Sequence, residues 1–294
     1  MTADFEQHRA HLHAVAYRML GSLSEADDAV QEAWLRLSRT AQSPGGRADV
    51  RDLRAWLTTV VSRVCLDMLR SRTSRREVPF DVHVPDPIVT GAGHPADDPQ
   101  ERAVLADSVG LALLVVLDTL SPPERLAFVL HDVFAVPFEE IGPVLDRSPA
   151  AAKQLASRAR RRLRGASSLS SDLGRQRQVA AAFLAAAQGG DFERLLTILD
   201  PEVTLRADAG AGPFGPSTVV RGARDVIAQA ARFAELGRHA RPVLVNGAPG
   251  FLVAPQGRPV ALLALTIEGD RVTQLNILAD PDRLARLDLT DVLG

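Results

Sequence analysis

Residues 138–164 constrain the fold of this chain more than any other segment. Two helical patterns, 138–145 and 149–164, are separated by only three residues. Ser148 can cap the second helix, and Pro149 suits its first position because an N–H there would have no helical partner. The apolar residues of the second helix form one stripe: Ala152, Leu155, Ala156, Ala159 and Leu163. The pattern predicts a helix-turn-helix unit.

The remainder of that second helix is polar and cationic. Arginine, lysine and glutamine hydrogen-bond base edges and phosphates when a recognition helix enters the major groove. A solvated basic helix in an all-α bundle is the alternative, but it needs neither the tight turn nor the cap. We therefore expect DNA binding by this face, which carries Lys153, Gln154, Ser157, Arg158, Arg160, Arg161 and Arg162.

Charge is segregated along the chain, although the formal net charge is only −2. Residues 51–76 hold seven arginines against two aspartates, and residues 147–167 hold seven basic residues and no acid. The stretch 77–146 between them holds thirteen acids against two arginines. Such segregation says more about a nucleic-acid partner than the net charge does.

Two helices are predicted near the N-terminus, at 24–37 and at about 52–71. Ser24 begins the first with a capping-box spacing, and Asp52 begins the second. The second is expected to bury Leu53, Leu57, Val60, Val64 and Met68. Opposite its own buried face, the first helix carries Asp28, Gln31, Glu32 and Leu35. Acids around an exposed leucine suit a protein partner with a basic groove, although a solvated acidic face gives the same pattern.

The second N-terminal helix runs into the arginine-rich stretch 70–76. Together with Trp56 and the adjoining loop 39–51, these cations could hold unpaired bases and their backbone. Residues 79–99 contain five prolines, which predicts a linker rather than a helix or strand. Residues 166–174 are rich in serine and glycine and predict a second linker.

The pattern changes from residue 175 onward. Helices are predicted at about 175–188, 191–199 and 223–236. Strands are predicted at 203–207, 218–221, 241–246, 250–254, 259–267 and 271–278. Helices followed by antiparallel strands predict an α+β domain.

Composition narrows the class of protein further. No apolar run reaches the roughly 18 residues that a membrane-spanning helix needs, and the N-terminus lacks the layout of a signal peptide. The single cysteine, Cys65, excludes an internal disulfide and disfavours a cysteine-based metal site. We expect a cytoplasmic protein without membrane insertion, metal or cofactor.

Three segments resemble the extracytoplasmic-function sigma factors of RNA polymerase, group IV of the sigma-70 family. GSLSEADDAVQEAWLRL (21–37) resembles sigma region 2.1–2.2, and DLRAWLTTVVSRVCLDMLRSRTSRRE (52–77) resembles regions 2.3–2.4. LDTLSPPERLAFVLHDVFAVPFEEIGPVLDRSPAAAKQLASRARRRLR (117–164) resembles region 4. The resemblance implies all-α domains at 1–78 and 105–166, a linker at 79–104, and no region 3.

The resemblance also implies partners and site residues. The helix 24–37 would bind the beta-prime clamp of core RNA polymerase through Asp28, Gln31, Glu32 and Leu35. The −10 promoter element would be bound by Trp56, Arg63, Arg70, Arg72, Arg75 and Arg76. The −35 element would be bound by Ser148, Lys153, Gln154, Ser157, Arg158, Arg160 and Arg161. An anti-sigma factor is possible for such a protein but is not required.

Residues 175–294 resemble a SnoaL-like domain, a cystatin-like cone fold that one sigma subfamily carries at its C-terminus. The resemblance rests on the segments 84–87, 208–213 and 280–284. It implies that the domain contacts the linker and modulates the sigma activity. The regulatory residues would be Pro85, Asp86, Pro87, Asp208, Asp280, Pro281 and Asp282.

Two other classes of function remain open. The chain could be a helix-turn-helix regulator with a ligand-sensing C-terminal domain. Alternatively, that domain could be an isomerase-like enzyme with Arg206, Asp208, His239 or Asn276 lining its cone-shaped pocket. The one tyrosine, Tyr17, lies outside the domain, so no tyrosine could serve there as an oxyanion donor. We expect no catalytic residue.

Overall fold

The computed structural model describes residues 2–42, 52–75, 82–92, 110–163 and 173–293. Contacts divide the chain into two compact units. Unit 1 comprises Met1–Val78 and Val116–Gly165, and unit 2 comprises Pro79–Val115 and Ala166–Gly294. Within the described residues, no helix combines the length and the apolarity that crossing a bilayer demands.

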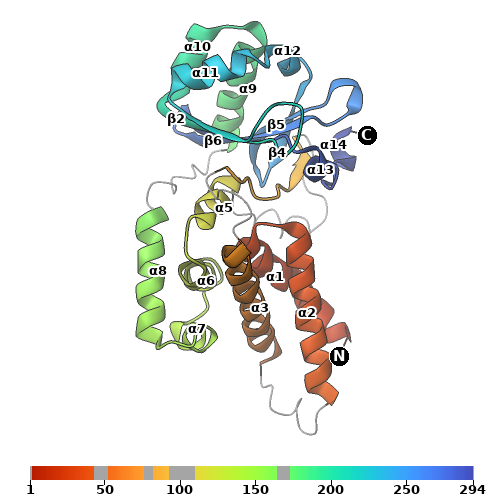
Figure 1. Ribbon diagram of the computed structural model, residues 1–294, viewed down its shortest axis with the longest axis vertical. Helices are drawn as coiled ribbons and strands as arrows, with labels where there is room; N and C mark the ends of the chain where they lie inside the picture. The colour runs from red at the N-terminus through yellow and green to blue at the C-terminus, as the bar shows by residue number, and fades with distance from the viewer. Residues whose placement is uncertain (1, 43–51, 76–81, 93–109, 164–172, 294) are drawn as a thin grey trace. The chain divides into compact units, whose positions relative to one another are not determined.

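Three helices form the first part of unit 1: α1 (Thr2–Leu20), α2 (Leu23–Gln42) and α3 (Leu53–Arg75) (Figure 1). The predicted apolar stripe of α2 is buried at Ala26, Ala29, Val30, Ala33 and Leu37, whereas Trp34 is half-buried. It begins at Leu23, so Ser24 lies inside the helix and the predicted cap at Ser24 is wrong. Asp52 does cap α3, because its Oδ1 accepts a hydrogen bond from the Ala55 N–H at 3.0 Å.

The buried face of α3 is wider than its sequence predicts. Leu57 and Val64 are buried as expected, whereas Leu53, Val60 and Met68 are only half-buried. The helix also buries Val61, Cys65, Leu66 and Leu69. The reason is that α3 packs against α1 and α2 on one side and against α6 and α7 on another. A single periodic stripe of apolar residues predicts one buried face, whereas α3 is buried on two sides.

The second part of unit 1 contains the helix-turn-helix. After α5 (Leu111–Asp118) come α6 (Pro122–Phe128), a π-helical turn η1 (Val129–Val133), α7 (Phe138–Val144) and α8 (Pro149–Leu163). The Ser148 Oγ accepts a hydrogen bond from the Ala151 N–H at 3.3 Å, as a cap of α8 should. The stripe of α8 is buried except at Leu155, which is half-buried.

Unit 2 is built on a seven-stranded sheet in the order β1-β4-β5-β6-β7-β2-β3. Its strands are β1 (Val89–Gly91), β2 (Leu199–Asp208), β3 (Thr218–Arg221), β4 (Ala240–Val245), β5 (Ala248–Val253), β6 (Ala261–Glu268) and β7 (Arg271–Leu278). The expectation of an antiparallel sheet is wrong at one place, because β2 and β7 pair in parallel. The long stretch of chain between these two strands supplies the crossover that a parallel pair requires.

The β1 strand comes from the proline-rich linker. Val89 lies opposite Val245, and Gly91 lies opposite Val243, in an antiparallel pair with β4. The prediction that the linker contributes no strand is therefore wrong. A three-residue strand has too short a pattern to detect, and its partner lies far along the chain.

Helices cover one face of the sheet (Figure 1). They are α9 (Leu173–Gly189), α10 (Phe192–Ile198), α11 (Ala223–Ala231) and α12 (Ala234–Gly237). Between them and the sheet lies an apolar core that includes Phe183, Leu205, Ile227, Phe251 and Leu275. The chain makes a short 3-10 turn at η2 (Pro255–Gly257) and ends in α13 (Pro281–Leu284) and α14 (Thr290–Leu293).

The polar residues proposed to line the cone do not face this core. Side chains alternate along a strand, and Leu205, Ala207, Leu275 and Ile277 face the helices. Arg206, Asp208 and Asn276 therefore lie on the opposite face of the sheet, where the Arg206 Nη1 donates to the Asn276 Oδ1 at 3.0 Å. His239 is exposed beyond α12. The predicted pocket lining is wrong for all four residues.

Two glycine-to-alanine substitutions should separate close packing from open space in unit 2. A Cβ at Gly250 would overlap the Leu263 carbonyl oxygen and the Val245 side chain, whereas one at Gly189 would meet nothing within 4 Å. Gly250→Ala should lower the free energy of unfolding by about 1–3 kcal/mol. Gly189→Ala should leave it unchanged or raise it by about 0.4–1 kcal/mol. Urea unfolding followed by circular dichroism measures both, and equal effects would contradict the packing described.

Candidate nucleic-acid interface and linker clamp

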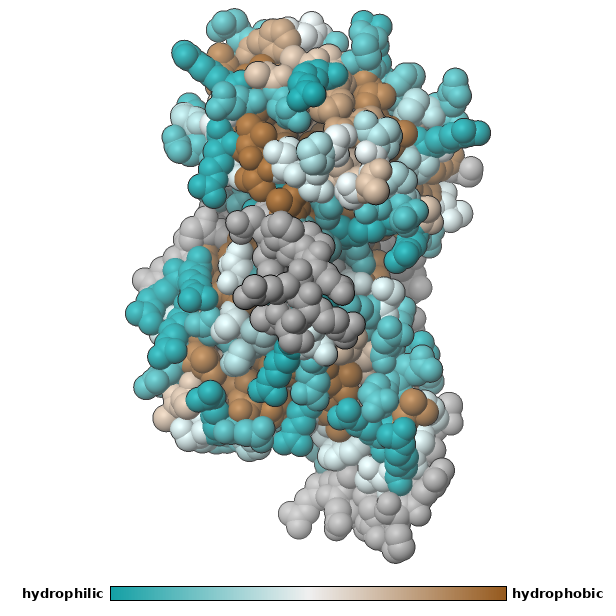
Figure 2. Space-filling model, in the orientation of Figure 1, coloured by the Kyte–Doolittle hydropathy of each residue, from teal (hydrophilic) through white to brown (hydrophobic). Residues whose placement is uncertain are grey.

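The outer face of α8 is polar and exposed to solvent. Figure 2 shows hydrophilic side chains along it, at the left of the view. The exposed polar residues are Lys153, Gln154, Ser157, Arg158, Arg161 and Arg162. Ser148 is exposed as well, but its hydroxyl is engaged in capping the helix. The structure therefore brings five of the seven predicted −35 residues onto one solvent-facing surface with their side chains available.

Two arginines of α8 are held by acids of the same unit. The Arg160 Nε donates to the Asp132 Oδ1 at 2.7 Å, and the Arg162 Nη1 donates to the Glu124 Oε2 at 2.9 Å. The Glu124 side chain is only 6% exposed and also accepts from the Ser121 N–H and hydroxyl. These pairs fix the C-terminal half of α8 against α6 and η1. Sequence reasoning missed both acids because they lie 28 and 38 residues from the arginines that they pair with.

The predicted polymerase-binding stripe lies at the surface of α2. Asp28 and Gln31 are exposed, and Leu35 is 40% exposed, which is unusual for a large apolar side chain of this protein. Glu32 is half-buried and accepts a hydrogen bond from the Arg36 Nε at 2.9 Å. The stripe thus combines two free polar side chains, one paired acid and one exposed leucine.

The arginines proposed for the −10 side differ in their surroundings. Arg70 is exposed and pairs loosely with Asp67, 3.7 Å away. Arg63 is exposed, and its Nη2 donates to the Pro143 carbonyl at 2.9 Å. Arg72 pairs with Glu25 and donates to the Leu20 carbonyl at 3.0 Å, so it joins α3 to the turn between α1 and α2. Trp56 is half-buried. The side chain of Arg75 and all of Arg76 lie outside the described residues.

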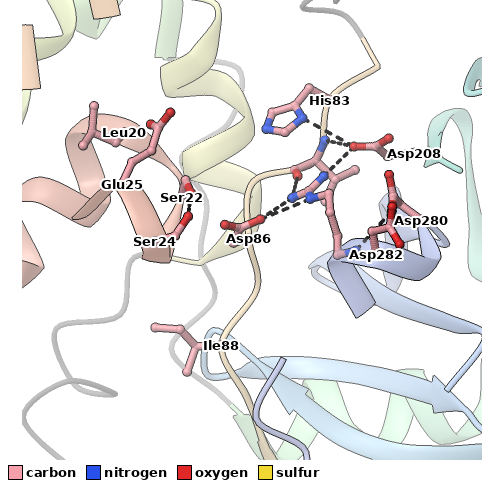
Figure 3. A network of polar contacts seen from close by, with 12 residues as sticks. Leu20, Ser22, Ser24, Glu25, His83, Asp86, Ile88, Asp208, Asp280 and Asp282 are labelled. Atoms are coloured by element: carbon pink, nitrogen blue, oxygen red, sulfur yellow. Dashed lines mark hydrogen bonds and ion pairs between the residues drawn. The ribbon is translucent and has the colours of Figure 1, made fainter. Parts of the chain in front are cut away.

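In unit 2, one guanidinium holds the linker (Figure 3). The Arg283 Nε and Nη2 donate to the Asp86 Oδ1 at 3.2 and 2.5 Å. Its Nη1 donates to the Asp208 Oδ2 at 2.6 Å, and its Nη2 also donates to the Val84 carbonyl at 2.5 Å. The same Asp208 oxygen accepts the Val84 N–H at 3.1 Å. We call Asp86, Asp208 and Arg283, with the backbone of Val84, the linker clamp.

A second contact follows two residues beyond the clamp. The Ile88 N–H donates to the Asn246 Oδ1 at 3.0 Å, and the Asn246 N–H donates to the Ile88 carbonyl at 2.8 Å. Alternate linker residues are thus hydrogen-bonded, and Pro85 and Pro87 between them are buried. An extended peptide adds to the edge of a sheet in this way: its main chain forms hydrogen bonds, and its alternate side chains are buried in pockets.

The segment 280–283 orients the side chain of Arg283 toward the linker. The Asp280 Oδ1 accepts the N–H groups of Asp282 and Arg283, at 2.9 and 3.1 Å, and so caps α13. Pro281 occupies the first turn, and the Asp282 side chain is exposed. Gly210 has a φ of +52°, and a Cβ there would overlap the Asp280 carboxylate. This glycine therefore leaves room for the cap.

Sequence reasoning named the acids of this site but missed Arg283 and Asn246. A cation within the segment 280–284 faces an acidic linker, so charge complementarity was a usable signal for Arg283. Asn246 precedes Gly247 in a turn between two strands, and its backbone is left-handed with a φ of +50°. An Asn-Gly pair predicts a turn, and this local pattern gives no indication that Asn246 contacts Ile88.

The clamp sets the charge state of Asp208. Burial alone would raise the pKa of its carboxyl group, but hydrogen bonds from His83 and the Val84 N–H, together with the charge of Arg283, lower that pKa below its ordinary value. The carboxylate is thus charged at neutral pH. Its stabilising contribution is present above the ordinary aspartate pKa and is lost as the pH falls through the lowered value of the folded state.

Comparison with known proteins agrees with this arrangement. Residues 5–75 match the family model of sigma-70 region 2, and residues 110–163 match that of sigma-70 region 4. The chain is 39% identical to the ECF RNA polymerase sigma factor SigJ of Mycobacterium tuberculosis (strain ATCC 25618 / H37Rv), over 96% of this chain and 92% of that protein. It is 37% identical to the probable ECF sigma factor SigI of the same species (strain CDC 1551 / Oshkosh), over 97% and 94%.

A solved structure extends the similarity to the whole architecture. The crystal structure of M. tuberculosis SigJ matches with a TM-score of 0.77 and 35% identity, over 98% of this chain and all of that one. The two matched regions define a protein of the sigma-70 class. More specifically, the chain belongs to the ECF RNA polymerase sigma factors, and it carries a C-terminal α+β domain that the SigJ structure also covers.

Two nearby arginines of α3 should respond differently to substitution. Arg72→Ala removes charged hydrogen bonds that join three helices, so we expect the free energy of unfolding to fall by about 1–3 kcal/mol. Arg70→Ala removes an exposed pair and should cost less than about 0.5 kcal/mol. Both tryptophans lie in unit 1, so their fluorescence reports its unfolding in urea. Equal losses would show that the Arg72 contacts do not stabilise this unit.

Proposed function

We propose that this chain is an alternative sigma factor that binds core RNA polymerase and directs it to specific promoters. The observation that carries the proposal is the exposed cationic face of α8 in a helix-turn-helix, within a chain that also contains sigma region 2. The relatives are named as RNA polymerase sigma factors, which supports the same conclusion.

The −35 element is bound by α8 in this proposal. Lys153, Gln154 and Ser157 lie in its first turns, where a recognition helix reaches base edges most easily. Arg158 and Arg161 lie later and suit phosphates, whose contacts position the helix without reading sequence. Ser148 acts through the cap. Arg160, which is paired with Asp132, positions the helix rather than reading a base.

Region 2 supplies the other contacts. The α2 stripe of Asp28, Gln31, Glu32 and Leu35 binds the beta-prime clamp of core polymerase. Trp56, Arg63, Arg70, Arg75 and Arg76 serve the −10 side, where cations and an aromatic ring suit unpaired bases. The contacts of Arg72 with Glu25 and Leu20 support a structural role in region 2 for that residue.

A reconstituted transcription assay tests the proposal as a whole. The purified chain is added to core polymerase on fragmented genomic DNA, and the 5′ ends of the transcripts are mapped. A sigma factor makes the polymerase start at defined sites. A helix-turn-helix regulator with a sensor domain, or an isomerase-like enzyme, leaves the start sites of core polymerase random, and that result would contradict the proposal.

Charge reversal on α2 tests the polymerase contact. Asp28→Arg with Gln31→Arg should weaken binding to core polymerase at least about tenfold, because like charges at such an interface repel. Fluorescence anisotropy of the labelled chain measures the affinity. Asp27→Arg is the matched control, since it reverses an exposed charge one residue outside the stripe. If both variants bind like the wild type, the α2 stripe is not the polymerase-binding surface.

We propose further that the C-terminal domain modulates the sigma activity by holding the linker. Val84, Asp86 and Ile88 each contact the domain, and they belong to the segment that joins regions 2 and 4 in sequence. Proline keeps such a segment extended, so fixing it limits how far the two DNA-binding regions can separate. Pro85, Pro87, Asp208, Asp280, Pro281 and Asp282 contribute through the contacts described above.

Removal of the C-terminal domain would affect more than the domain itself. Val84 is buried within unit 2, and Leu111–Val115 also belongs to that unit. Truncation near residue 167 would therefore expose apolar residues before the helix-turn-helix as well as remove the domain. A point substitution in the clamp is the cleaner experiment.

Breaking the clamp should change transcription by a large factor. Arg283→Met keeps the length of the side chain but removes its pairs with Asp86 and Asp208, and we expect the amount of run-off transcript to change by about tenfold. Asp86→Ala should act in the same direction, and the double variant should behave like Arg283→Met alone, because that substitution already removes the pair with Asp86. Arg286→Met, one turn later and exposed, is the matched control. Activity of both clamp variants equal to that of the control would show that the clamp does not regulate transcription.

No catalytic role is proposed for the C-terminal domain. The residues that face its helices form an apolar core, and Arg206, Asp208 and Asn276 occupy the other face of the sheet. Asp208 is also engaged by Arg283 and Val84. A general base needs access to its substrate, which these contacts deny to Asp208.

A further inference from the structure

The arginines of the helix-turn-helix fall into two groups. Two of them are paired with acids of the same unit, as described above. The other three, Arg147, Arg158 and Arg161, are exposed, and their side chains form no hydrogen bond or ion pair with any residue that the structure describes. Arg158 and Arg161 belong to the predicted −35 surface. Arg147 lies in the turn before α8, and the −35 surface predicted from the sequence does not include it.

The turn holds the backbone of Arg147 in place. The Arg147 N–H donates to the Gly142 carbonyl of α7 at 2.9 Å. A Cβ at Gly142 would lie only 2.8 Å from the Arg147 carbonyl oxygen, so the turn packs directly on α7. Asp146, which precedes Arg147, has a left-handed backbone with a φ of +54°, and Ser148, which follows it, caps α8. Arg147 is therefore fixed at the start of α8, and only its side chain is free to reorient.

The acids nearest in sequence do not neutralise Arg147. Asp146 is exposed, as are Glu139 and Glu140 in the first turn of α7, and none of the three forms an ion pair within the described residues. The Arg147 guanidinium can thus bind an anion without giving up an existing pair. A single surface arginine is commonly only hydrated. The position of Arg147 relative to the base-reading residues distinguishes it from such an arginine.

Cations lie at both ends of the exposed face of α8. At about 100° per residue, the exposed side chains from Lys153 to Arg161 fall within an arc of about 140°, opposite the buried stripe. At about 1.5 Å per residue, Arg158 and Arg161 lie about 15 and 20 Å along the helix from Ser148, the neighbour of Arg147. The side chains proposed to read bases lie between these cations.

This spacing fits the two backbones that border a major groove. The groove is about 12 Å wide, and a helix whose central residues reach the base edges has its two ends near the phosphates of opposite strands. Contacts to phosphates fix the register and orientation of a protein on the duplex without reading its sequence. A guanidinium suits this task because it can donate two parallel hydrogen bonds to one phosphate.

We infer that Arg147 binds a backbone phosphate at one edge of the −35 element, while Arg158 and Arg161 bind phosphates of the opposite strand. The recognition helix is then anchored across the major groove at both of its ends. Arg147 is a positioning residue in this arrangement, since it sets the orientation of α8 and reads no base. This inference rests on the proposed function, because its ligand is promoter DNA.

Neutral phosphates test the assignment in the holoenzyme formed by the full chain and core polymerase. On a promoter mapped in the transcription assay above, methylphosphonate replaces each phosphate of the −35 element in turn, on either strand. Arg147→Gln should weaken binding to the unmodified promoter about tenfold, as expected for the loss of a charged hydrogen bond. It should lose no further affinity when its own partner phosphate is neutral. Arg161→Gln should show the same coupling to a phosphate of the other strand.

Three further measurements separate a phosphate contact from a structural effect. Arg147→Lys keeps the charge and should retain most of the affinity. The slope of log affinity against log salt concentration should fall by about one in Arg147→Gln and stay unchanged in Arg147→Lys. Arg177→Gln removes an exposed arginine of α9, outside the helix-turn-helix, and should bind like the wild type. The unfolding midpoints of all variants should match that of the wild type, because these side chains are exposed.

The outcomes distinguish this inference from the proposed function. Binding of the wild-type holoenzyme at a defined promoter supports the proposed function whatever Arg147 does, and without such binding both fail. The inference is overturned if Arg147→Gln binds as tightly as the wild type or no more weakly than Arg177→Gln. It is also overturned if Arg147 couples to no single phosphate, or to a phosphate on the same strand as the partner of Arg161.

Discussion

The guanidinium of Arg283 faces two carboxylates and a backbone carbonyl, and it joins Asp86 and Val84 of the linker to Asp208 of the C-terminal domain. Its side chain is only 17% exposed, and those of Asp86 and Asp208 are 23% and 13% exposed. Removing one partner from such a site leaves a poorly hydrated charge behind, so the three groups are stable only together. The planar guanidinium fixes the direction of its hydrogen bonds to the carboxylates as well as their distance, whereas a lysine ammonium would not. The position of Val84 and Asp86 on the C-terminal domain depends on this side chain, whereas Ile88 and β1 are held by Asn246 and β4.

The α8 helix is held by similar means. Glu124 lies in the first turn of α6, where its carboxylate accepts a hydrogen bond from the Ser121 N–H. The same carboxylate also accepts a hydrogen bond from the Arg162 guanidinium of α8. Asp132, which lies in η1, likewise accepts a hydrogen bond from the Arg160 guanidinium of α8. The last turns of the recognition helix are thereby fixed to its own domain, while the first turns remain exposed. The C-terminal end of α8 is therefore held rigidly, and its N-terminal end is free to contact bases. Base recognition requires that the helix be positioned in this way.

Sequence could predict the elements that are long or have strong end signals. The stripes of α2 and α8 and the caps Asp52 and Ser148 depend on residues within a few positions of each other, so local rules apply. The buried face of α3, the β1 strand and the parallel pair of β2 with β7 depend on partners far along the chain, and no local pattern contains them. The same holds for the site. The exposed residues of α8 and α2 could be named in advance, whereas the partners of Arg160 and Arg72 could not.

Amide hydrogen exchange at Val84 and Ile88 tests most directly that the C-terminal domain holds the linker. Both N–H groups are hydrogen-bonded to side chains of that domain, Asp208 and Asn246. In the free wild-type chain they should exchange far more slowly than in an unstructured peptide of the same sequence. In Arg283→Met, Val84 should lose this protection while the amides of β6 and β7 keep theirs. Exchange of Val84 and Ile88 at the peptide rate in the wild type would contradict the account.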